Sequence, residues 1–465
     1  MASLLSTLQG KSYAVLGLGL TGLSAARALK KANITVRCWD DREGSREAAA
    51  KLKLELCSFE NDADFDGVDG LILSPGIAHS FPRPHPIVER ASHLNVPILS
   101  DIELLRQLDP DTPLIAITGT NGKSTTTALT GHILSKHRDV QIGGNIGVPV
   151  MDLKKPKKGG AYVFELSSYQ LDLTPSLKPQ VAVLLNITPD HIERHGGFEG
   201  YVQAKYKIFN NPITAEKPLA VICIDDEYCE KIAEQLRAED LWRVVTIAVF
   251  SDRAADISVS DGVLTDQGAD VSMDLNKNKR MNGQHNHQNA AASYAALHYG
   301  FDLSAEDFEE GFLIYEGLNH RQYLIRTING VAYVNDSKAT NAQASSCALS
   351  SHKNIYWIVG GRPKSGGLDG LEEFSDRIRH AFLIGESSEA FAKWMALNNI
   401  DFDMSHTVDI ALAKAHQMAQ DRRGAPGGAG VVLLSPACAS FDQFKTFEQR
   451  GEYFENLVLA LEGDV

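Results

Sequence analysis

The chain of 465 residues is 43% hydrophobic and 22% charged, and its 45 basic and 59 acidic residues give a net charge of −14. This composition is typical of a globular protein, and the length predicts about three domains. The acidic balance argues against nucleic acid or an anionic membrane surface as a partner.

The amino-terminal stretch and the cysteines indicate the cellular compartment. MASLLSTLQGKSYAVLG lacks the basic start and unbroken apolar core of a signal peptide, and no apolar run approaches the ~18 residues of a membrane span. The six cysteines are scattered without a C-x-x-C pair, which disfavours a zinc site. We therefore expect a cytoplasmic protein without membrane insertion, acting as a monomer.

Short apolar runs rich in β-branched residues alternate with helix-like stretches along the whole chain. The runs that we expect to be strands are 12–17, 70–76, 113–119, 161–168, 181–188, 219–226, 332–339, 355–361, 381–386 and 431–437. Continuous apolar strands that alternate with helices predict an α/β fold with parallel sheets covered on both faces. The stretch 256–276 alternates apolar and polar residues, which predicts small hairpins instead.

The pattern divides the chain into three domains, 1–100, 101–317 and 318–465. Residues 84–113, PHPIVERASHLNVPILSDIELLRQLDPDTP, are predicted to form a helical bridge between the first two, ending in Pro110 and Pro113.

A glycine turn follows the first predicted strand. Gly17, Gly19 and Gly22 form G-x-G-x-x-G and open an Ala/Leu-rich helix, and Asp40 and Asp41 end the next strand. This is the fingerprint of a dinucleotide site, in which the helix N-terminus favours a diphosphate. The pattern alone favours NAD or NADP but does not separate a dinucleotide from another diphosphate, such as a UDP-sugar.

The second domain opens on PLIAITGTNGKSTTT, a strand that runs into a phosphate-type loop and a helix. Gly122, Lys123 and Ser124 end the pattern G-x-x-x-x-G-K-[ST], but Ile117 stands where its first glycine belongs. The context still allows backbone N–H groups from Gly119 to Ser124 to cradle phosphates. Lys123 could bridge the β- and γ-phosphates, and the Ser124 hydroxyl could bind Mg²⁺.

Three candidate residues follow in the same domain. They are Glu165 in YVFELSSYQL, His191 in NITPDHIERHGG and Lys205 in YVQAKYKIF. Taken singly, Glu165 is more simply interpreted as a surface acid, His191 as a loop residue and Lys205 as a solvated lysine. In this order after TGTNGKST, they resemble the middle domain of the Mur ligases, ATP-dependent enzymes that form amide bonds, in which the displaced glycine is usual.

The resemblance implies an N-terminal Rossmann-like domain, a central ATPase-type α/β domain with a parallel sheet, and a C-terminal Rossmann-like α/β domain. It also implies that Ser124, Glu165 and His191 bind Mg²⁺. Lys205 would join them as a carbamate formed with CO₂, which replaces a cation by an oxygen ligand that suits Mg²⁺. The residues that the resemblance assigns to ATP are Gly119, Thr120, Asn121, Gly122, Lys123, Ser124, Thr125, Asn289, Arg321 and Asp336.

Motifs along the whole chain are similar to the D-glutamate-adding branch of this family. They are GLGLTGLS, SPGIA, GNIGVP, ELSSYQL, NDSKATN and SPACASFDQFKTFEQRG. The residues that would contact UDP-N-acetylmuramoyl-L-alanine are Leu20, Thr21, Asp40, Arg42, Ser74, Asn145 and Gln170. Those that would surround D-glutamate are Lys338, Thr340, Lys364, Ser440, Phe441 and Phe447.

One loop departs from the family pattern, because GGRPKSGG carries Arg362 and Pro363 where many relatives have an acidic residue. Which basic group meets the D-glutamate side chain is therefore left open.

The implied reaction has two steps, in which ATP converts the substrate carboxylate into an acyl phosphate and the amine of D-glutamate then displaces phosphate. Three alternatives remain: a nicotinamide-dependent oxidoreductase built on the glycine turn, a non-catalytic nucleotide-binding protein, and a related ligase that adds another amino acid.

Overall fold

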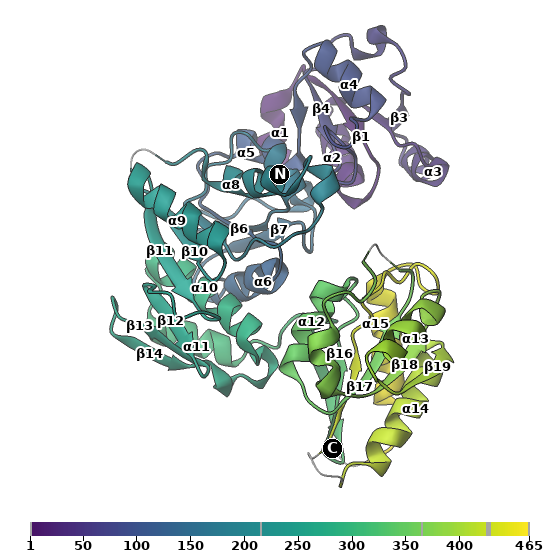
Figure 1. Cartoon of the computed structure of the whole chain (residues 1–465). Coiled ribbons are helices and arrows are strands. Elements are labelled where there is room, and N and C mark those ends of the chain that lie inside the picture. Colours follow the sequence, from purple (N-terminus) through teal and green to yellow (C-terminus); the bar gives the residue numbers. More distant parts are fainter. Residues whose placement is uncertain (1, 214–215, 364–365, 425–428, 464–465) are drawn as a thin grey trace. The chain divides into compact units, whose positions relative to one another are not determined.

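The computed structural model describes residues 2–213, 216–363, 366–424 and 429–463 (Figure 1). Within these residues the strands form three sheets of five, nine and six strands. The chain divides into two compact units, Met1–Asn278 with Asn286–Tyr315, and Lys279–His285 with Glu316–Val465. Both are α/β, as predicted, whereas the division of the first unit into two domains near residue 100 stays a prediction. No helix in the described ranges is long and apolar enough to cross a membrane.

The first sheet is parallel throughout and has the order β3-β2-β1-β4-β5. Its strands are β1 (Ser12–Leu16), β2 (Thr35–Trp39), β3 (Glu55–Leu56), β4 (Gly70–Leu73) and β5 (Ile98–Leu99). The helices that accompany them are α1 (Ala2–Leu5), α2 (Leu20–Lys31), α3 (Glu43–Lys51) and α4 (Pro86–His93). Apolar residues of α2 pack with Val15 and Ile72 on one face, and those of α4 pack with Ala14 and Leu71 on the other. Coverage of both faces explains the continuous apolar strands.

The predicted helical bridge over 84–113 is wrong in one respect. The segment contains two helices, α4 and α5 (Asp101–Leu108), separated by β5, which adds an edge strand to the first sheet. The strand is only two residues long, Ile98 and Leu99, so the apolar pattern of the neighbouring helices conceals it.

The nine-stranded sheet has the order β14-β13-β12-β11-β10-β9-β6-β8-β7. Its strands are β6 (Leu114–Thr118), β7 (Val140–Gly144), β8 (Ala161–Glu165), β9 (Val181–Leu184), β10 (Leu219–Cys223), β11 (Arg243–Ala248), β12 (Ile257–Ser260), β13 (Val263–Asp266) and β14 (Val271–Asp274). Strands β6 to β12 pair in parallel, while β12, β13 and β14 form antiparallel hairpins, which confirms the prediction for 256–276.

Strand β6 lies between β8 and β9 in the sheet, although β7 and β8 come between β6 and β9 in the chain. The chain therefore leaves β6 toward one side of the sheet and later returns to its other side. The carboxyl end of such a strand is where open α/β sheets bind ligands. Helices of this part of the chain are α6 (Lys123–Leu134), α7 (Ser168–Asp172), α8 (Phe198–Tyr206), α9 (Glu227–Glu239), α10 (Gln284–Phe301) and α11 (Ala305–Leu313).

One hydrophobic core runs from the first sheet into the central one. It includes Val15 and Leu29 of the amino-terminal segment, Leu104 of α5, and Phe164 and Leu184 of the central sheet. This shared core explains why the first sheet and the central sheet belong to one compact unit. Each Å² of apolar surface removed from water contributes about 25 cal/mol to the stability of the packing.

The six-stranded sheet of the second unit has the order β15-β16-β20-β17-β18-β19 and is parallel except for the β15–β16 pair. Its strands are β15 (Tyr323–Ile328), β16 (Val331–Asn335), β17 (Ile355–Gly360), β18 (Ile378–Ile384), β19 (Phe402–His406) and β20 (Val431–Leu434). The helices are α12 (Ala342–Ser351), α13 (Ser388–Leu397), α14 (Val408–Asp421) and α15 (Phe447–Leu459). Residues of α12 and α13 pack with Trp357 on one face, and those of α14 and α15 pack with Tyr356 on the other.

Short 3-10 helices complete the described structure. They are η1 (Ser6–Leu8), η2 (Asp62–Phe65), η3 (Val150–Asp152), η4 (Ile192–Arg194), η5 (Lys207–Phe209), η6 (Leu275–Lys277), η7 (Lys279–Met281) and η8 (Glu372–Arg377).

Ser100 joins the first sheet to the central one, which yields a stability prediction. Its buried hydroxyl accepts the Glu103 N–H at 2.9 Å as the N-cap of α5 and lies 2.8 Å from the Thr174 hydroxyl. Ser100→Ala should lower the free energy of unfolding by about 1–3 kcal/mol, because it removes a cap and a buried hydrogen bond. Urea unfolding followed by circular dichroism measures this loss.

Ser304→Ala is the matched control, since Ser304 caps α11 by accepting the Asp307 N–H at 3.1 Å in a more exposed setting. It should cost only about 1 kcal/mol. Equal losses in the two variants would contradict a junction role for Ser100.

Candidate active site

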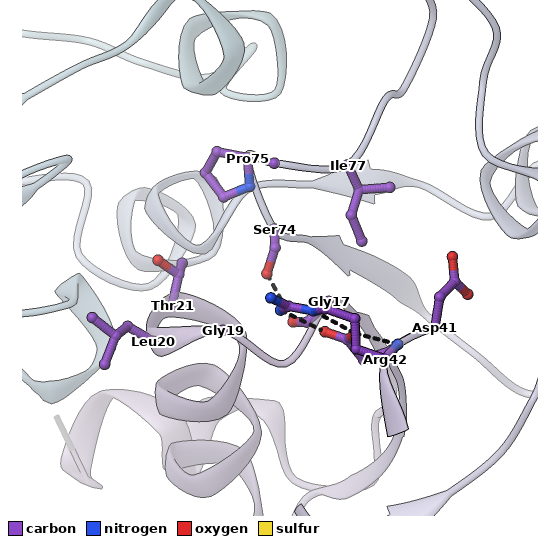
Figure 2. A pocket seen from close by; sticks show the side chains of 11 residues that line it. Gly17, Gly19, Leu20, Thr21, Asp41, Arg42, Ser74, Pro75 and Ile77 are labelled. Carbon is purple, nitrogen blue, oxygen red and sulfur yellow. Dashed lines mark hydrogen bonds and ion pairs between the residues drawn. The ribbon is translucent and has the colours of Figure 1, made fainter. Parts of the chain in front are cut away.

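A pocket of about 510 Å³ opens beside the glycine turn at the carboxyl ends of β1, β2 and β4 (Figure 2). Its lining includes the predicted residues Leu20, Thr21, Asp40, Arg42 and Ser74. The remaining lining residues are Gly17, Gly19, Asp41, Pro75, Gly76 and Ile77. Asn145 and Gln170, predicted for the same substrate, do not line this pocket and lie in the central sheet region.

The glycines of the turn have different roles. A Cβ on Gly22 would lie 1.8 Å from the Gly17 carbonyl oxygen, so the helix packs against the turn only without a side chain there. Gly19 is the N-cap of α2, and no side chain caps the helix. A Cβ on Gly19 would meet nothing within 4 Å, so the space in front of the helix is open. The helix N-terminus is therefore approachable, as binding of a phosphate group requires.

The Asp40 carboxylate binds backbone N–H groups in the glycine turn and after β2. Its carboxylate accepts the Leu18 N–H at 2.7 Å and the Arg42 N–H at 2.9 Å. Burial raises the pKa of Asp40, but hydrogen bonds from the Arg42 side chain and from these two N–H groups lower it more, so the net pKa is below its usual value. Asp40 is ionised at neutral pH and fixes the turn. The Arg42 side chain is 73% exposed at the pocket.

The phosphate-type loop follows β6 and leads into α6. Gly119 has a φ of +154°, and a Cβ there would lie 2.9 Å from the Leu185 Cβ. Gly122 has a φ of +84°, and a Cβ there would lie 2.2 Å from the Asn289 side-chain oxygen. Gly122 is the N-cap of α6, again without a side-chain cap. Both glycines are thus required by conformation and by space.

Asn186, two residues after the end of β9, is a residue that the sequence did not indicate. Its side-chain oxygen accepts the Asn121 N–H at 2.8 Å, and its amide nitrogen donates to the Asn121 carbonyl at 3.2 Å. Its backbone carbonyl accepts the Thr120 N–H at 2.9 Å. The N–H groups from Gly119 to Ser124, which were predicted to cradle phosphates, are therefore not equally available. Those of Thr120 and Asn121 already donate to Asn186, so any phosphate contact of the loop would lie toward the start of α6.

A second asparagine secures the same loop from α10. The Asn289 side-chain oxygen accepts from the Thr126 hydroxyl at 3.1 Å, and its amide donates to the Asn286 side chain at 3.4 Å. Gln288, the residue before it, accepts from Asn186 at 3.3 Å. The amino-terminal part of α10 thus lies against the phosphate loop, where Asn289 was predicted to bind nucleotide.

Lys123 and Lys205 converge on one carbonyl oxygen. The Lys123 ammonium lies 2.9 Å from the Gly119 oxygen and 2.8 Å from the Thr120 oxygen, and the Lys205 nitrogen lies 2.7 Å from the same Gly119 oxygen. Lys205 is only 1% exposed, and its nitrogen lies 4.6 Å from the centre of the Tyr201 ring. Burial, and then the charge of Lys123, lower the pKa of Lys205 well below its ordinary value.

Glu165 ends β8, next to β6 in the sheet, where Ile117 is its register partner. Its Oε1 accepts from the Asn145 amide at 2.9 Å, while its Oε2 is buried without a hydrogen-bond partner among the described residues. A buried carboxylate oxygen without a partner is costly, and a cation would satisfy it. Asn145 thus orients Glu165, a role that the sequence did not indicate.

Gln170 has a structural role that the sequence did not indicate, and its predicted contact with the substrate stays a prediction. Its side-chain oxygen accepts from the Ser167 N–H at 3.0 Å and from the Ser167 hydroxyl at 2.8 Å, and the Ser167 hydroxyl accepts the Gln170 N–H at 3.3 Å. This reciprocal pair is a capping box at the start of α7. In the structure the oxygen of Gln170 therefore caps a helix.

His191 follows β9 in the left-handed conformation, with a φ of +52°. Its side chain is half exposed, lies 3.5 Å from the Asp190 carboxylate and packs 5.2 Å from the centre of the Tyr169 ring. In the described ranges no group of three or more His, Cys, Asp and Glu side chains is arranged to hold a metal ion. A magnesium site here would therefore need other oxygen ligands as well, such as Ser124, which is buried at the start of α6.

The candidate residues of the second unit lie in loops that follow β16, β17 and β20, which are adjacent strands. Asp336 is buried, accepts from the Ser435 hydroxyl at 2.7 Å, and has its pKa raised to about 7 by burial. Its neighbour two residues on, Lys338, has its ammonium 4.0 Å from the centre of the Phe447 ring. These loops therefore meet at one edge of the sheet, as predicted from their positions at strand ends.

The remaining predicted residues of this unit differ in exposure. Ser440 is buried, its carbonyl accepting the Phe444 N–H at 2.8 Å, whereas Phe441 is 62% exposed. Thr340 lies between β16 and α12, and Arg321 between α11 and β15. Lys364 lies outside the described residues. Arg362, in the loop that departs from the family pattern, is paired with Glu386 at 2.9 Å.

Comparisons with known proteins identify the family. The model described as Mur ligase middle domain matches residues 117–297, and the model described as Mur ligase MurD-like, N-terminal domain, matches residues 11–100. The chain is 45% identical over 456 residues to a UDP-N-acetylmuramoylalanine–D-glutamate ligase of Paramagnetospirillum magneticum, covering 98% of both chains. The chain belongs to the Mur ligase family.

Other relatives agree with this assignment. A UDP-N-acetylmuramoylalanine–D-glutamate ligase of Rhodospirillum rubrum is 43% identical over 99% of this chain and 97% of its own. Among solved structures, UDP-N-acetylmuramate-alanine ligase of Thermotoga maritima is similar in fold, with a TM-score of 0.59, 16% identity and coverage of 97% and 99%. A folylpolyglutamate synthase of Mycobacterium tuberculosis gives a TM-score of 0.55 at 16% identity, covering 78% of this chain and 94% of its own. The match over 11–100 places the glycine turn in a Mur ligase domain, against the oxidoreductase hypothesis.

Asn186 provides a test of the phosphate loop in this Mur ligase. Asn186→Ala removes two hydrogen bonds to Asn121 and should weaken binding of MgADP about 10- to 100-fold, equivalent to about 1–3 kcal/mol. Isothermal titration calorimetry measures the affinity.

Asn211→Ala is the control, because the Asn211 side chain also donates to a backbone carbonyl, that of Pro175 at 2.7 Å, on an exposed loop. Its affinity for MgADP should equal that of the unsubstituted protein. The same affinity in Asn186→Ala would show that the loop keeps its shape without the asparagine.

Proposed function

We propose that the protein is an ATP-dependent ligase that joins D-glutamate to the terminal carboxylate of UDP-N-acetylmuramoyl-L-alanine and releases ADP and phosphate. The observation that carries the proposal is the 45% identity, over 98% of both chains, to a relative named for this reaction. We propose that the product is a precursor of peptidoglycan and that the reaction takes place in the cytoplasm. We retain a monomer as the proposed functional state.

ATP is the proposed phosphoryl donor, bound through the loop 119–125. Two glycines in strained or crowded positions, an approachable helix N-terminus and Lys123 support this assignment. Such a loop binds phosphates through N–H groups and the helix dipole. Asn289 from α10 is proposed as a further nucleotide contact, together with Arg321 and Asp336 of the second unit.

Mg²⁺ is the proposed metal, with Ser124, Glu165, His191 and the carbamate of Lys205 as candidate ligands. The oxygen of Glu165 that lacks a partner supports a cation there. When bound, the metal would offset negative charge on the transferring phosphoryl group. These residues supply hard oxygen ligands and one imidazole, of which the oxygens are the ligands that Mg²⁺ prefers.

The carbamate proposal follows from the state of the Lys205 amine. An amine reacts with CO₂ only when neutral, forming a nitrogen–carbon bond and releasing a proton. Burial of Lys205 beside Lys123 favours the neutral form. The carbamate would carry a negative charge. The positive charge of Lys123, which repels a protonated Lys205, would then attract the modified side chain.

The uridine nucleotide is proposed to occupy the 510 Å³ pocket, with its diphosphate at the N-terminus of α2. Leu20, 82% exposed, offers an apolar surface for a base, and Arg42 offers a cation. Thr21 and Ser74 complete the proposed set at the pocket, together with Asp40, whose carboxylate holds Arg42 and the turn in place. Asn145 and Gln170 are proposed for the muramoyl-alanine end.

D-Glutamate is proposed to bind to the loops of the second unit. Lys338 carries a positive charge suited to a carboxylate and is oriented by the Phe447 ring. Thr340, Lys364, Ser440 and Phe441 are the other proposed contacts.

The proposed reaction activates a carboxylate that is otherwise a poor electrophile. The substrate carboxylate oxygen attacks the γ-phosphorus, and the bond to the bridging oxygen breaks to release ADP. The amine of D-glutamate then attacks the acyl phosphate carbon, phosphate leaves with the bonding electrons, and the nitrogen loses a proton. Lys123 is proposed to offset charge on the phosphoryl oxygens, and the position of its ammonium at the loop carbonyl of Gly119 supports this role.

A phosphate-release assay with a panel of amino acids tests the proposal. With ATP, Mg²⁺ and UDP-N-acetylmuramoyl-L-alanine, D-glutamate should support release of phosphate, and L-alanine, L-lysine and L-glutamate should not. Release with another amino acid but not D-glutamate would point to a related ligase. ATP binding without amine-dependent release would point to a non-catalytic nucleotide-binding protein.

Lys205→Ala tests the carbamate. Activity should fall at least 100-fold, because an oxygen ligand for the metal is lost, and acetate or formate should restore part of it by supplying a carboxylate. Lys231→Ala, which removes an exposed lysine paired with Glu227, should leave activity unchanged. Full activity of Lys205→Ala without added acid would exclude the role.

A further inference from the structure

Arg194 connects the loop that bears His191 to the wall of the nucleotide-sugar pocket. Its guanidinium donates to the carbonyl oxygens of Gly76 at 3.2 Å, Ile77 at 3.0 Å and Pro75 at 3.5 Å. These three residues form part of the 510 Å³ pocket beside Ser74, and all of them belong to the same compact unit as Arg194. One side chain therefore holds three successive carbonyls of the pocket wall.

The other side of Arg194 contacts the surroundings of His191. Its guanidinium carbon lies 4.6 Å from the centre of the Tyr169 ring, and the same ring lies 5.2 Å from that of His191. Arg194 and His191 are also the end and the N-cap of η4, and the Arg194 N–H donates to the His191 carbonyl at 3.0 Å. A shift of Arg194 would therefore move His191 in two ways. The two residues lie at the ends of the short turn of η4, and both side chains pack against the Tyr169 ring.

Further contacts join the same two segments. A Cβ on Gly196 would lie 2.8 Å from the Phe81 ring, so this ring packs directly on the backbone after η4. The buried carboxylate of Asp172 lies 3.4 Å from His195 and 3.8 Å from His79, and 2.7 Å from Lys207. Burial raises the pKa of Asp172, but hydrogen bonds from His195 and Lys207 lower it more, so its carboxylate is ionised.

Arg194 has no acidic partner among the described residues, because each of its hydrogen bonds ends on a backbone carbonyl. A planar guanidinium suits several carbonyls at once, since it presents its N–H donors in a fixed fork. Lysine could keep the charge and the ring contact but could not span the three oxygens.

Resting on the proposed function, we propose that Arg194 is a positioning residue that couples the nucleotide-sugar pocket to the metal–ATP site. A ligand that fills the pocket restricts the motion of residues 75–77. Because Arg194 is hydrogen-bonded to these residues, η4 also becomes more restricted. His191 is then held in the position where the metal–nucleotide complex binds. Binding at either site therefore strengthens binding at the other by the same factor, as thermodynamic linkage requires.

The test measures this factor in the full chain. The affinity for Mg²⁺ with a non-hydrolysable ATP analogue is titrated in the absence and presence of saturating UDP-N-acetylmuramoyl-L-alanine. In the unsubstituted protein the ratio of the two dissociation constants should be about five or more. In Arg194→Ala it should approach one, while each ligand alone binds within about threefold of its normal affinity.

Arg194→Lys and Arg90→Ala separate coupling from damage to the fold. Arg194→Lys should give an intermediate ratio. Arg90 donates to the Phe59 carbonyl at 2.7 Å within the same unit but outside both sites, so Arg90→Ala should keep the full ratio. A purely structural role of Arg194 would lower thermal stability and leave the ratio unchanged.

The outcomes distinguish this inference from the function on which it rests. If the unsubstituted protein does not bind UDP-N-acetylmuramoyl-L-alanine, the proposed function and the inference both fail. If it binds this substrate and catalyses D-glutamate-dependent release of phosphate, but the ratio is one or does not change in the Arg194 variants, the inference alone is overturned.

Discussion

The loop after β6 is constrained by a lysine amine that is buried against it. Lys205 and Lys123 both donate to the Gly119 oxygen, and Lys205 is almost fully withdrawn from water. Two ammonium ions in this position would repel each other at low dielectric, and desolvation adds to the cost. The arrangement is stable when Lys205 is neutral or when anions lie close to both. The proposed site, in which phosphates and a carbamate on Lys205 would lie close to Lys123, would satisfy this constraint.

The displaced glycine of the loop follows from how β6 is packed. Ile117, where a strict phosphate loop has its first glycine, is buried and pairs with Val183 and Glu165, so the strand continues through it. The bend comes at Gly119, where the backbone approaches Leu185 too closely for any side chain. The turn therefore begins two residues later, and Asn186 fixes it by binding the backbone of Asn121.

The sequence predicted the buried parallel strands well, because both faces of these sheets are covered and the strands are continuous apolar runs. Among the strands that it did not identify, β3 and β5 are two residues long and β7 ends in Gly143 and Gly144, so their patterns are weak. Lysines and acids at strand ends were predicted through their likeness to a family. Asn186, Arg194 and the capping role of Gln170 were not, because their partners are largely backbone groups, which no residue type reveals.

The glycine turn differs from a dinucleotide site in the contacts of the acid that follows the second strand. In a dinucleotide site the acid after the second strand binds the ribose hydroxyls. Here Oδ1 of Asp40 accepts from the N–H and Nε of Arg42, and Oδ2 accepts from the Leu18 N–H and from Nη2 of Arg42. A carboxylate accepts about four hydrogen bonds, so these donors occupy its capacity. Ribose hydroxyls would therefore have to displace Arg42 from Asp40. The exposed side chains around the turn, which include Arg42 and Leu20, are then the groups that would determine which ligand binds.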